Sequence, residues 1–381
     1  MILEVFDKQR NRVAMIKQYS SAEYTVKFNG VGTFTISVNV NDDSIKYLVI
    51  DNYILLDAGI MGIIKRRSKI NALSTSMTIN GYMISHILSY RTFIKTQVFS
   101  GTVEEIIEQM MNNNFINPQD IKRKIDFIKF EKYNLSGESK KVQNTGGTVE
   151  EAIESVLLVE DKGFSFEPEI AKYNEDTGNL TNVSNFILKI LEPVDRSFNN
   201  KENNNPIVFS VDLNNLEELS FEEDGSDYKN LGIVAGAGEG EERIILEVGA
   251  LDLSGIDRQE VYIDARDLSK TKYENNIEVI IPDNEYQEML NSRGNERLKD
   301  YELFLDLDGK IVTQGQTVNN YGKDYFLGDY VTVIDNELGY MVNAQITEFK
   351  KTISNGTEKN DLTFGYQRES LRKILKKRGA I

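Results

Sequence analysis

The sequence predicts a β-rich α+β protein with two small antiparallel β-barrel domains and two α/β insertion domains. Residues 1–97 and residues 325–367 alternate apolar and polar side chains with a period of two, which is typical of antiparallel strands with one buried face. Between these ends, two short segments carry apolar residues at helical spacing. The two β-rich ends also resemble each other, which indicates two related modules in one chain.

The first β-rich segment contains several short strands. Tyr24, Val26 and Phe28 are predicted to face one way, while the polar residues between them face the other way. After a glycine-rich turn, apolar residues at positions 34, 36, 38 and 40 repeat the pattern. Several such strands in fewer than about 100 residues favour a small barrel or a sandwich. We therefore predict a first β-barrel domain over residues 1–97.

Two similar helices are predicted in residues 98–205, which we expect to form an α/β domain. Thr102 with Glu105, and Thr148 with Glu151, have the spacing of a capping box at a helix start. Asparagines at positions 112–114 are predicted to end the first helix. The apolar residues that follow each capping box lie on one helical face: Val103, Ile106, Ile107, Met110 and Met111 in the first, and Val149, Ala152, Ile153, Val156 and Leu157 in the second.

The second half of the chain returns to strands. We predict a discontinuous second β-barrel domain from residues 206–255 and 320–367, interrupted by a small α/β insertion over residues 256–319. Pro282 and Asp283 are expected to begin a helix in this insertion, and Gly294 is expected to break it. Residues 368–381 form a basic C-terminal tail in this division.

The internal similarity between the two ends has a defined order. Near the N-terminus the chain reads DNYILL, then GIMGIIKRRSK, then STSMTINGYMISHIL. Near the C-terminus it reads GDYVTV, then GYMVNAQITEFKK, then NDLTFGYQRESLRKIL. Both runs predict a strand, a turn, a longer strand, a polar hairpin and a further strand, which indicates duplicated β modules.

Composition narrows the functional class. The chain has 381 residues, a formal net charge of -16, one histidine and no cysteine. An acidic surface repels nucleic-acid phosphates and anionic membranes, and a chain without cysteine has neither disulfides nor a thiolate nucleophile. The N-terminus lacks the features of a signal peptide, and no apolar run reaches the roughly 20 residues of a membrane helix. We expect synthesis and assembly in the cytoplasm, without membrane insertion.

A glycine-rich segment, GAGEG at Gly236–Gly240, invites a nucleotide-binding interpretation. A phosphate-binding loop needs a following helix whose N-terminal amides face the anion. Here the residues from Arg243 to Val248 have strand character, and three nearby glutamates would repel phosphate. We therefore predict a wide turn or bulge between two strands.

Two other motifs contain residue types that can take part in catalysis or metal binding. DLDG at Asp306–Gly309 resembles a fragment of a calcium loop or a phosphotransfer motif, but Lys310 and apolar residues follow it, so a hairpin turn is predicted. His86 is the only histidine, which excludes a histidine-based metal cluster, and we predict a structural residue on a short helix. No catalytic, cofactor-binding or metal-binding residue is predicted.

Acidic and basic segments leave alternatives open. Carboxylates are abundant, so a glycosidase-type pair remains an alternative, although FEEDGSDY at 221–228 is expected to form a solvated turn. The basic tail is either a solvated end or a docking arm that pairs with an acidic surface on a neighbouring subunit. Its basic residues are Arg368, Arg372, Lys373, Lys376, Lys377 and Arg378.

Several motifs resemble siphophage tail-tip (baseplate) hub proteins, which are related to the trimeric hubs of contractile tails. Gly81, Ile84, Leu88 and Arg91 occupy the places of a strand-to-helix motif in that family. LGDYVTV at Leu327–Val333 is similar to a late strand of the family and contains Gly328 and Asp329. The most specific motif is a strand-turn-strand segment that contains Gly236, Gly238, Glu239, Gly240 and Arg243. The resemblance covers about residues 1–367.

This resemblance implies a structural protein and not an enzyme. It implies a homotrimer whose six barrels match the sixfold tail tube, and which encloses the channel through which DNA leaves. The implied partners are the tail tube or distal tail ring protein, the C-terminus of the tape-measure protein, and tip or receptor-binding proteins, with DNA only in transit. The implied location is the tail tip of a phage or prophage virion. A tail-tip adhesin or carbohydrate-binding protein is one alternative, and a carboxylate-dependent hydrolase is a second.

Overall fold

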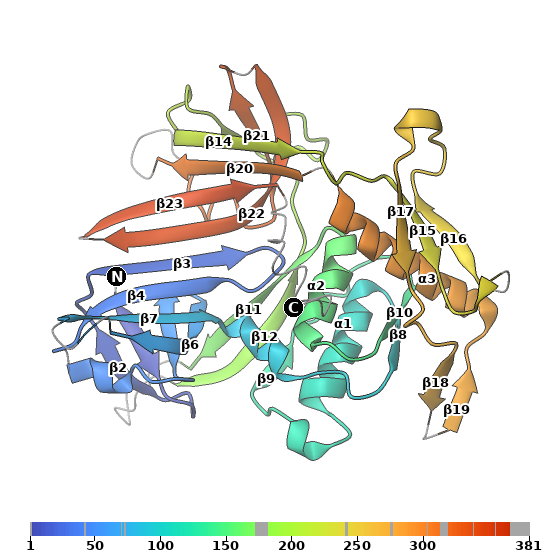
Figure 1. Cartoon of the computed structure of the whole chain (residues 1–381). Helices are drawn as coiled ribbons and strands as arrows, with labels where there is room; N and C mark the ends of the chain where they lie inside the picture. The colour runs from blue at the N-terminus through green and yellow to red at the C-terminus, as the bar shows by residue number, and fades with distance from the viewer. Residues whose placement is uncertain are drawn as a thin grey trace. The chain divides into compact units, whose positions relative to one another are not determined.

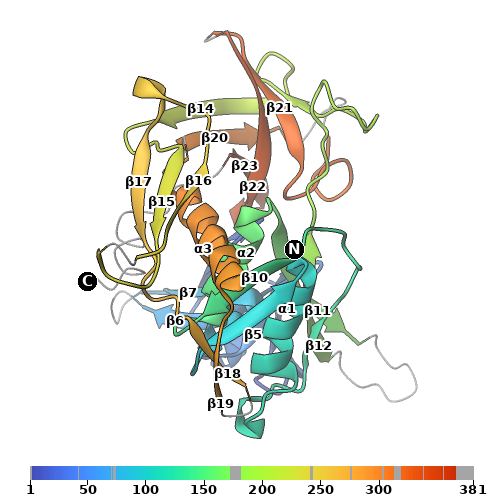
Figure 2. The same ribbon diagram turned by 90° about the vertical axis from the view of Figure 1, so that its right-hand side faces the viewer.

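The chain divides into two compact units in a computed structural model, which describes residues 2–41, 43–69, 71, 74–171, 182–240, 243–274, 277–302, 304–312, 319–337, 339–354 and 356–365. The first unit contains residues 1–193, 272–277 and 348–361. The second unit contains residues 194–271, 278–347 and 362–381. Figures 1 and 2 draw the chain from two directions.

The first unit is built on a predominantly antiparallel sheet whose strands have the order β3-β4-β7-β6-β5-β1-β2. Residues 348–354 of β22 (Tyr340–Ser354) pair with β3 on its other side. The bounds of these strands are β1 Leu3–Phe6, β2 Arg12–Ile16, β3 Ser21–Lys27, β4 Thr33–Asn39, β5 Tyr53–Asp57, β6 Ile60–Ser68 and β7 Ser76–Met83.

Burial follows the predicted alternation in this sheet. Tyr24 and Phe28 are buried, as are Phe34 and Ile36 on the neighbouring strand, while Val26 is half-buried. Alternate side chains of a strand point to opposite faces, so one face of β3 and β4 packs inward and the other remains accessible. The prediction of a β-rich fold with antiparallel strands is confirmed for this segment.

Two helices cover part of the first unit, and Figure 1 shows them side by side. α1 (Val103–Met111) and α2 (Val149–Val159) bury all the apolar residues that were assigned to their inner faces. One hydrophobic core joins these residues to Phe6, Tyr53 and Ile63 from the strands. Residues on both sides of position 97 therefore share a core. The unit also contains η1 Asp43–Tyr47, η2 Ile84–Tyr90, β8 Gln97–Gly101, η4 Ile121–Arg123, β9 Ile128–Phe130, β10 Lys140–Asn144, β11 Gly163–Ile170 and β12 Val183–Leu191.

Both predicted capping boxes are present. The Thr102 hydroxyl accepts a hydrogen bond from the backbone of Glu105, whose carboxylate accepts one from the Thr102 backbone, and Thr148 and Glu151 repeat this exchange. Thr102→Ala and Thr148→Ala should each lower the free energy of unfolding by about 1 kcal/mol, because a helix N–H loses its acceptor. Urea titration measures this loss. Thr75→Ala, at an exposed position in the first unit, should change the unfolding free energy little.

The α-helix α1 ends at Met111 with Asn112 as its C-cap, as predicted, but the chain does not leave the helical path there. The chain continues through a turn of π-helix, η3 (Asn112–Ile116). Asn114 is fully buried there, and its side chain donates to the Met110 carbonyl at 2.9 Å. Phe115 is also fully buried, so the turn extends the apolar face. An asparagine that bonds back to the preceding turn can be held within a helix by packing.

The second unit repeats the strand order of the first. Its sheet has the order β14-β20-β23-β22-β21-β13, to which β22 contributes residues up to 347 and β23 contributes residues from 362. In chain order, β13, β14, β20, β21, β22 and β23 correspond to β1, β3, β4, β5, β6 and β7. The last pair differs, since β13 is parallel to β21 whereas β1 is antiparallel to β5. The bounds are β13 Val208–Phe209, β14 Leu216–Asp224, β20 Phe304–Ile311, β21 Tyr330–Asp335 and β23 Thr357–Phe364.

The strand pairing assigns other residues to the second module than the predicted ranges do. β20 was placed in the insertion at 256–319, yet it pairs with β14 in the module sheet. DLDG lies within β20 and not at a hairpin tip, so that prediction was wrong. The turn predicted at 221–228 is confirmed only in its second half, because residues 221–224 lie within β14 whereas the Tyr228 amide donates to the Gly225 carbonyl. Asp-Gly favours a tight turn locally, but pairing with a distant strand overrides that preference.

The segment between β14 and β20 forms a small sheet with the order β16-β15-β17, and α3 packs along it in both views (Figures 1 and 2). Gly294 does not break α3, contrary to the prediction. A Cβ atom at Gly294 would lie 2.5 Å from a methyl carbon of Val234, so glycine lets the helix approach the sheet closely. The bounds are β15 Leu231–Ala235, β16 Ile245–Gly249, η6 Gly255–Asp257, β17 Glu260–Asp264, β18 Thr271–Glu274, β19 Ile277–Ile280, α3 Asp283–Leu298 and η7 Lys299–Tyr301.

The described strand pairings do not close a barrel. Within the described residues of each unit, the pairings form a path whose two end strands are not paired with each other. The protein therefore has a β-rich fold with mainly antiparallel pairing and, among the described residues, few helices. In the part of the chain that the structure describes, no helix has the length and apolarity needed to cross a membrane.

Candidate functional site

The GAGEG segment forms the connection of the β15–β16 hairpin. β15 pairs with β16 in antiparallel register, and a strand rather than a helix follows the glycines. Gly238 has φ 109° and Gly240 has φ 57°, which favour glycine at a turn. The prediction of a turn between strands is confirmed, and among the described residues the strand β16 follows the turn, not the helix that a phosphate-binding loop needs.

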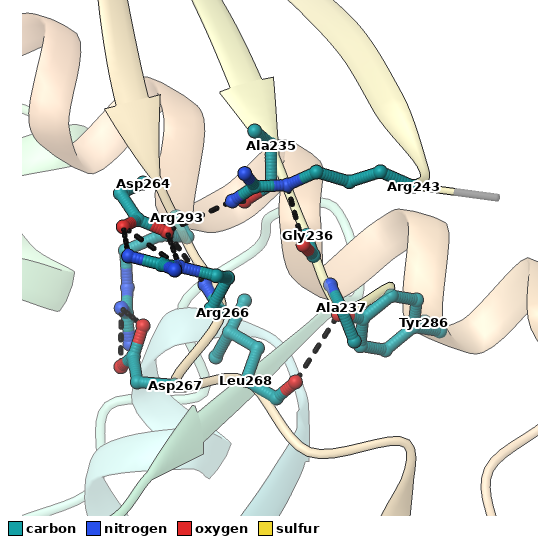
Figure 3. Close-up of polar contacts among 10 residues, drawn as sticks. All are labelled: Ala235, Gly236, Ala237, Arg243, Asp264, Arg266, Asp267, Leu268, Tyr286 and Arg293. Atoms are coloured by element: carbon teal, nitrogen blue, oxygen red, sulfur yellow. Dashed lines mark hydrogen bonds and ion pairs between the residues drawn. The ribbon is translucent and has the colours of Figure 1, made fainter. Parts of the chain in front are cut away.

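Arg243 holds the two sides of this connection together (Figure 3). Its Nε donates to the Gly236 carbonyl at 3.1 Å, and one terminal nitrogen donates to the Ala235 carbonyl at 3.2 Å. The same nitrogen lies 3.0 Å from Oδ1 of Asp264. Five donors in a planar fork allow arginine to bond several acceptors at once. Arg243 therefore fixes the end of β15 to the segment that leads into β16 and also to β17.

An ion-pair cluster continues from Arg243. The guanidinium of Arg266 binds both carboxylate oxygens of Asp264, with a shortest distance of 2.6 Å, and Arg293 of α3 binds Asp267 at 2.8 Å. The hydrogen bond from Arg266 is the main cause that lowers the pKa of Asp264. Because these carboxylates are occupied by arginine, the cluster binds chain segments to one another and offers no poised general base.

Tyr286 of α3 completes the connection from the other side (Figure 3). Its hydroxyl accepts a hydrogen bond from the Ala237 backbone at 2.8 Å and donates to the Leu268 carbonyl at 3.1 Å. The side chain is fully buried, and this burial raises its pKa. A Cβ at Gly236 would lie 2.9 Å from the hydroxyl, so glycine is required for the approach.

Tyr286→Phe should lower the free energy of unfolding of the second unit by about 2 kcal/mol, because the buried Leu268 carbonyl and the part-buried Ala237 amide lose their partner. Urea titration measures the change, and hydrogen exchange should become faster at the Ala237 amide. Tyr262→Phe is the matched control, since that ring is 57% exposed and should tolerate the loss of its hydroxyl. Equal effects of the two substitutions would contradict this role.

Gly81 and Arg91 lie in the first unit. Gly81 is in β7 opposite Phe34, whose ring occupies the space that a side chain at Gly81 would need. Arg91 follows η2, and its guanidinium donates to the Arg123 carbonyl at 2.9 and 2.7 Å. Both residues stabilise local packing.

Gly328 and Asp329 precede β21 in the second unit. Gly328 has φ 96°, and its amide donates to the Ile346 carbonyl at 2.8 Å. Asp329 is 2% exposed; its carboxylate accepts from Arg196 Nε at 2.7 Å and from the backbone amides of Phe326 and Val194 at 3.0 and 3.3 Å. Asp329 therefore ties the chain near residue 195 to the start of β21.

His86 lies on the short helix η2, as predicted. Its ring stacks on Tyr82 with centroids 4.4 Å apart, and its Nδ1 lies 3.5 Å from a Glu150 oxygen. Within the described residues, no group of three or more histidine, aspartate or glutamate side chains could hold a metal. The predicted docking tail, with Arg372, Lys373, Lys376, Lys377 and Arg378, lies outside the described residues.

The structure places five motif residues in the β15–β16 connection: Gly236, Gly238, Glu239, Gly240 and Arg243. Gly81 and Arg91 lie apart in the first unit, and Gly328 and Asp329 lie at the start of β21. Sequence reasoning missed Asp264, Arg266 and Tyr286, which complete the cluster around the glycine-rich connection. These residues follow no spacing rule relative to the motif, so the sequence offered no signal for them. The cluster fixes backbone, and its chemistry is structural.

The fold is shared with solved phage tail proteins. The prophage tail protein gp18 of Listeria monocytogenes EGD-e has a TM-score of 0.56 and 14% sequence identity, over 100% of this chain and 98% of gp18. The 43 kDa tail protein of prophage MuSo2 from Shewanella oneidensis has a TM-score of 0.56 and 10% identity, over 96% of this chain and 98% of that one. A tail protein of Neisseria meningitidis MC58 has a TM-score of 0.54 and 12% identity, over 96% of both chains. All three structures are of tail proteins, two of them from prophages, and this chain is similar to them in fold.

The family is defined by the sequence itself. Residues 2–366 match the Siphovirus ReqiPepy6 Gp37-like protein family, and the chain belongs to this family. The predicted resemblance to siphophage tail proteins is thereby confirmed. No curated protein matches the chain.

Proposed function

We propose that this protein is the structural hub of a phage or prophage tail tip and performs no catalysis. Three copies form a ring that adapts the sixfold tail tube to a threefold tip and encloses the channel for DNA. In this proposal each of the two modules closes into a barrel-like shape in the assembly. The protein is then a component of the virion tail tip, assembled in the cytoplasm of the bacterial host.

The observation that carries this proposal is the repeated strand order of the two units. A closed homotrimer presents every surface patch three times. Two related modules in each chain turn three copies into six similar modules, which is the number needed to match a hexameric ring. Membership of a siphovirus family and a fold shared with tail proteins support the same class.

In this proposal each partner contacts a different part of the ring. The six modules contact the tail tube or distal tail ring protein, the channel admits the C-terminus of the tape-measure protein, and the opposite side carries tip or receptor-binding proteins. The net charge of -16 suits a ring through which DNA passes, because an acidic wall repels phosphates.

The oligomeric state tests the proposal. Analytical ultracentrifugation of the purified chain should give the mass of three copies, or, where the chain trimerises only on its tail ring partner, the mass of that ring plus three copies. Negative-stain images should show a hollow threefold ring. A chain that remains monomeric with and without the partner contradicts the hub.

The two alternatives make different predictions for the same protein. A monomer that binds bacterial cells or glycans would support an adhesin. A measurable turnover that is lost in Asp306→Asn or Asp308→Asn with the fold intact would support a carboxylate-dependent hydrolase and would overturn the non-catalytic proposal.

A further inference from the structure

The first unit has a surface on which aromatic side chains lie beside a cation. Tyr82 of β7 and Tyr90 of η2 are both exposed, and both rings contact His86, with centroids 4.4 and 5.6 Å from its ring. The Nζ of Lys65 lies 4.7 Å from the centroid of Tyr90, which is the distance of a cation–π contact. These rings therefore form a linked group at the surface of the first unit.

Two isoleucines extend this surface past the end of η2. Arg91 donates to the Arg123 carbonyl at 2.9 and 2.7 Å, and Arg123 donates to the Thr92 carbonyl at 2.8 Å, so the loop after η2 lies against η4. Ile94 and Ile121 each lie two residues from one of these contacts, a reach of about 7 Å, and are 71% and 72% exposed. This surface therefore presents apolar area that a partner can bury.

The cations beside these apolar side chains lack carboxylate partners within the described part of the chain. No ion pair there joins a carboxylate to any of four cations: Arg91, Lys95, Lys122 and Arg123. Burial, and after it the neighbouring charge of Arg123, lowers the pKa of Arg91. The Nε of Arg123 is buried without an acceptor. An anion beside this arginine pair would relieve the repulsion between the two like charges.

Lys65 and residues 82–96 and 120–124 form what we call the cationic strip. These residues contain six lysines and arginines and one acidic residue, whereas the whole chain has a formal net charge of -16. The surface outside the cationic strip is therefore strongly acidic and complementary to it in charge. Protein interfaces combine apolar and aromatic side chains with arginine, as the cationic strip does. A second copy of this chain provides an acidic protein surface of the required kind.

The charge of the cationic strip also selects the kind of contact between copies. In a twofold contact a surface patch meets the same patch of the partner, which here would bring cations against cations. A contact between the cationic strip and a different, acidic surface is head-to-tail. Head-to-tail contacts close into a ring when the rotation between copies permits it.

We propose that the cationic strip binds an acidic surface of a neighbouring copy and forms one half of the head-to-tail contact that closes the ring. This inference rests on the proposed hub and names the surface through which its copies associate. Burial of Ile94 and Ile121 supplies affinity, and the charges set the orientation and speed the encounter.

Sedimentation equilibrium of the purified full chain tests the apolar part of the cationic strip. Ile94→Ser with Ile121→Ser should raise the dissociation constant of the trimer at least about tenfold, because both side chains lose their burial in the interface. The matched control is Ile256→Ser with Ile280→Ser, which removes two exposed isoleucines of the second unit and should leave the constant unchanged. Circular dichroism establishes that each variant is folded.

Charge variants test the electrostatic part. Lys95→Glu with Lys122→Glu should also raise the dissociation constant at least about tenfold, and about 0.5 M salt should weaken the native trimer, since salt screens exposed charges. Lys201→Glu with Lys323→Glu makes the same change in net charge at exposed positions of the second unit and should have a much smaller effect.

The possible outcomes separate this inference from the hub. A native trimer that is equally stable in the variants of the cationic strip overturns the inference and leaves the hub intact. Equal losses in the strip variants and in the controls overturn it as well. A native chain that is monomeric alone also overturns the inference, whereas the hub fails only if the chain stays monomeric with its tail ring partner.

Discussion

Gly81→Ala should destabilise the first unit by about 3 kcal/mol or more, which is the upper range for overpacking a well-packed site. A Cβ at this position would lie 1.9 Å from the Ile63 carbonyl oxygen and 2.5 Å from the Phe34 ring. The nearest atom is backbone, so no change of rotamer relieves the contact. β7 is paired with β4 and β6 at this point, and the strain therefore reaches both neighbours.

The matched control for this substitution is Gly137→Ala. Gly137 is exposed in a connecting segment and has no atom within 4 Å of a built Cβ. Urea titration of both variants should show a large loss of unfolding free energy for the first and little change for the second. Equal stability of the two variants would show that β7 has room at Gly81, and the packing argument would fail.

The helices were predictable because their signals are local. A capping box needs two residues three positions apart, and an amphipathic face needs a spacing of three and four. Both conditions are met within the segments that form α1 and α2, and the structure contains both boxes and both buried faces. The duplicated modules were predictable for a related reason, because strand order leaves a pattern of turns and alternation in each copy.

The wrong predictions share a different physical origin. Gly294 lowers helix propensity locally, but Val234 and Val248 on the distant strands β15 and β16 require a small residue there, so packing keeps the helix intact. Asp308 and Gly309 form a good turn pair locally, but the partner strand β14 lies far away in the sequence. In each case a contact with a remote segment decided the structure, and no short window contains that contact.

In the glycine-rich connection, too, the local residues were predictable and the contacts with remote segments were not. Its glycines and Arg243 were identified from a family resemblance, and the turn was predicted from the strand character of the residues that follow. Asp264 and Tyr286, which fix the connection, come from β17 and α3. The residues of a turn can be identified from the sequence. The residues of other elements that form hydrogen bonds to the turn are set by the tertiary fold.

Asp329→Ala should lower the unfolding free energy of the second unit by about 3–5 kcal/mol, because it leaves Arg196 without its buried partner. The carboxylate is 2% exposed and accepts hydrogen bonds from Arg196 and from two backbone amides, so one substitution leaves three donors unsatisfied. The strand β21 begins at the next residue, and its pairing near residue 195 depends on this anchor. Urea titration gives the loss, and hydrogen exchange should increase at Tyr330, whose amide bonds to the Val194 carbonyl.

A double-mutant cycle separates the ion pair from the backbone bonds. Arg196→Met removes the cation and retains an apolar stem, so Asp329→Ala in that background should cost clearly less than in the native chain. Asp257→Asn is the matched control, since Asp257 is exposed and should contribute little. If Asp329→Ala costs the same with and without Arg196, the pair does not stabilise the fold, and the two backbone amides alone account for the burial of this carboxylate at the start of β21.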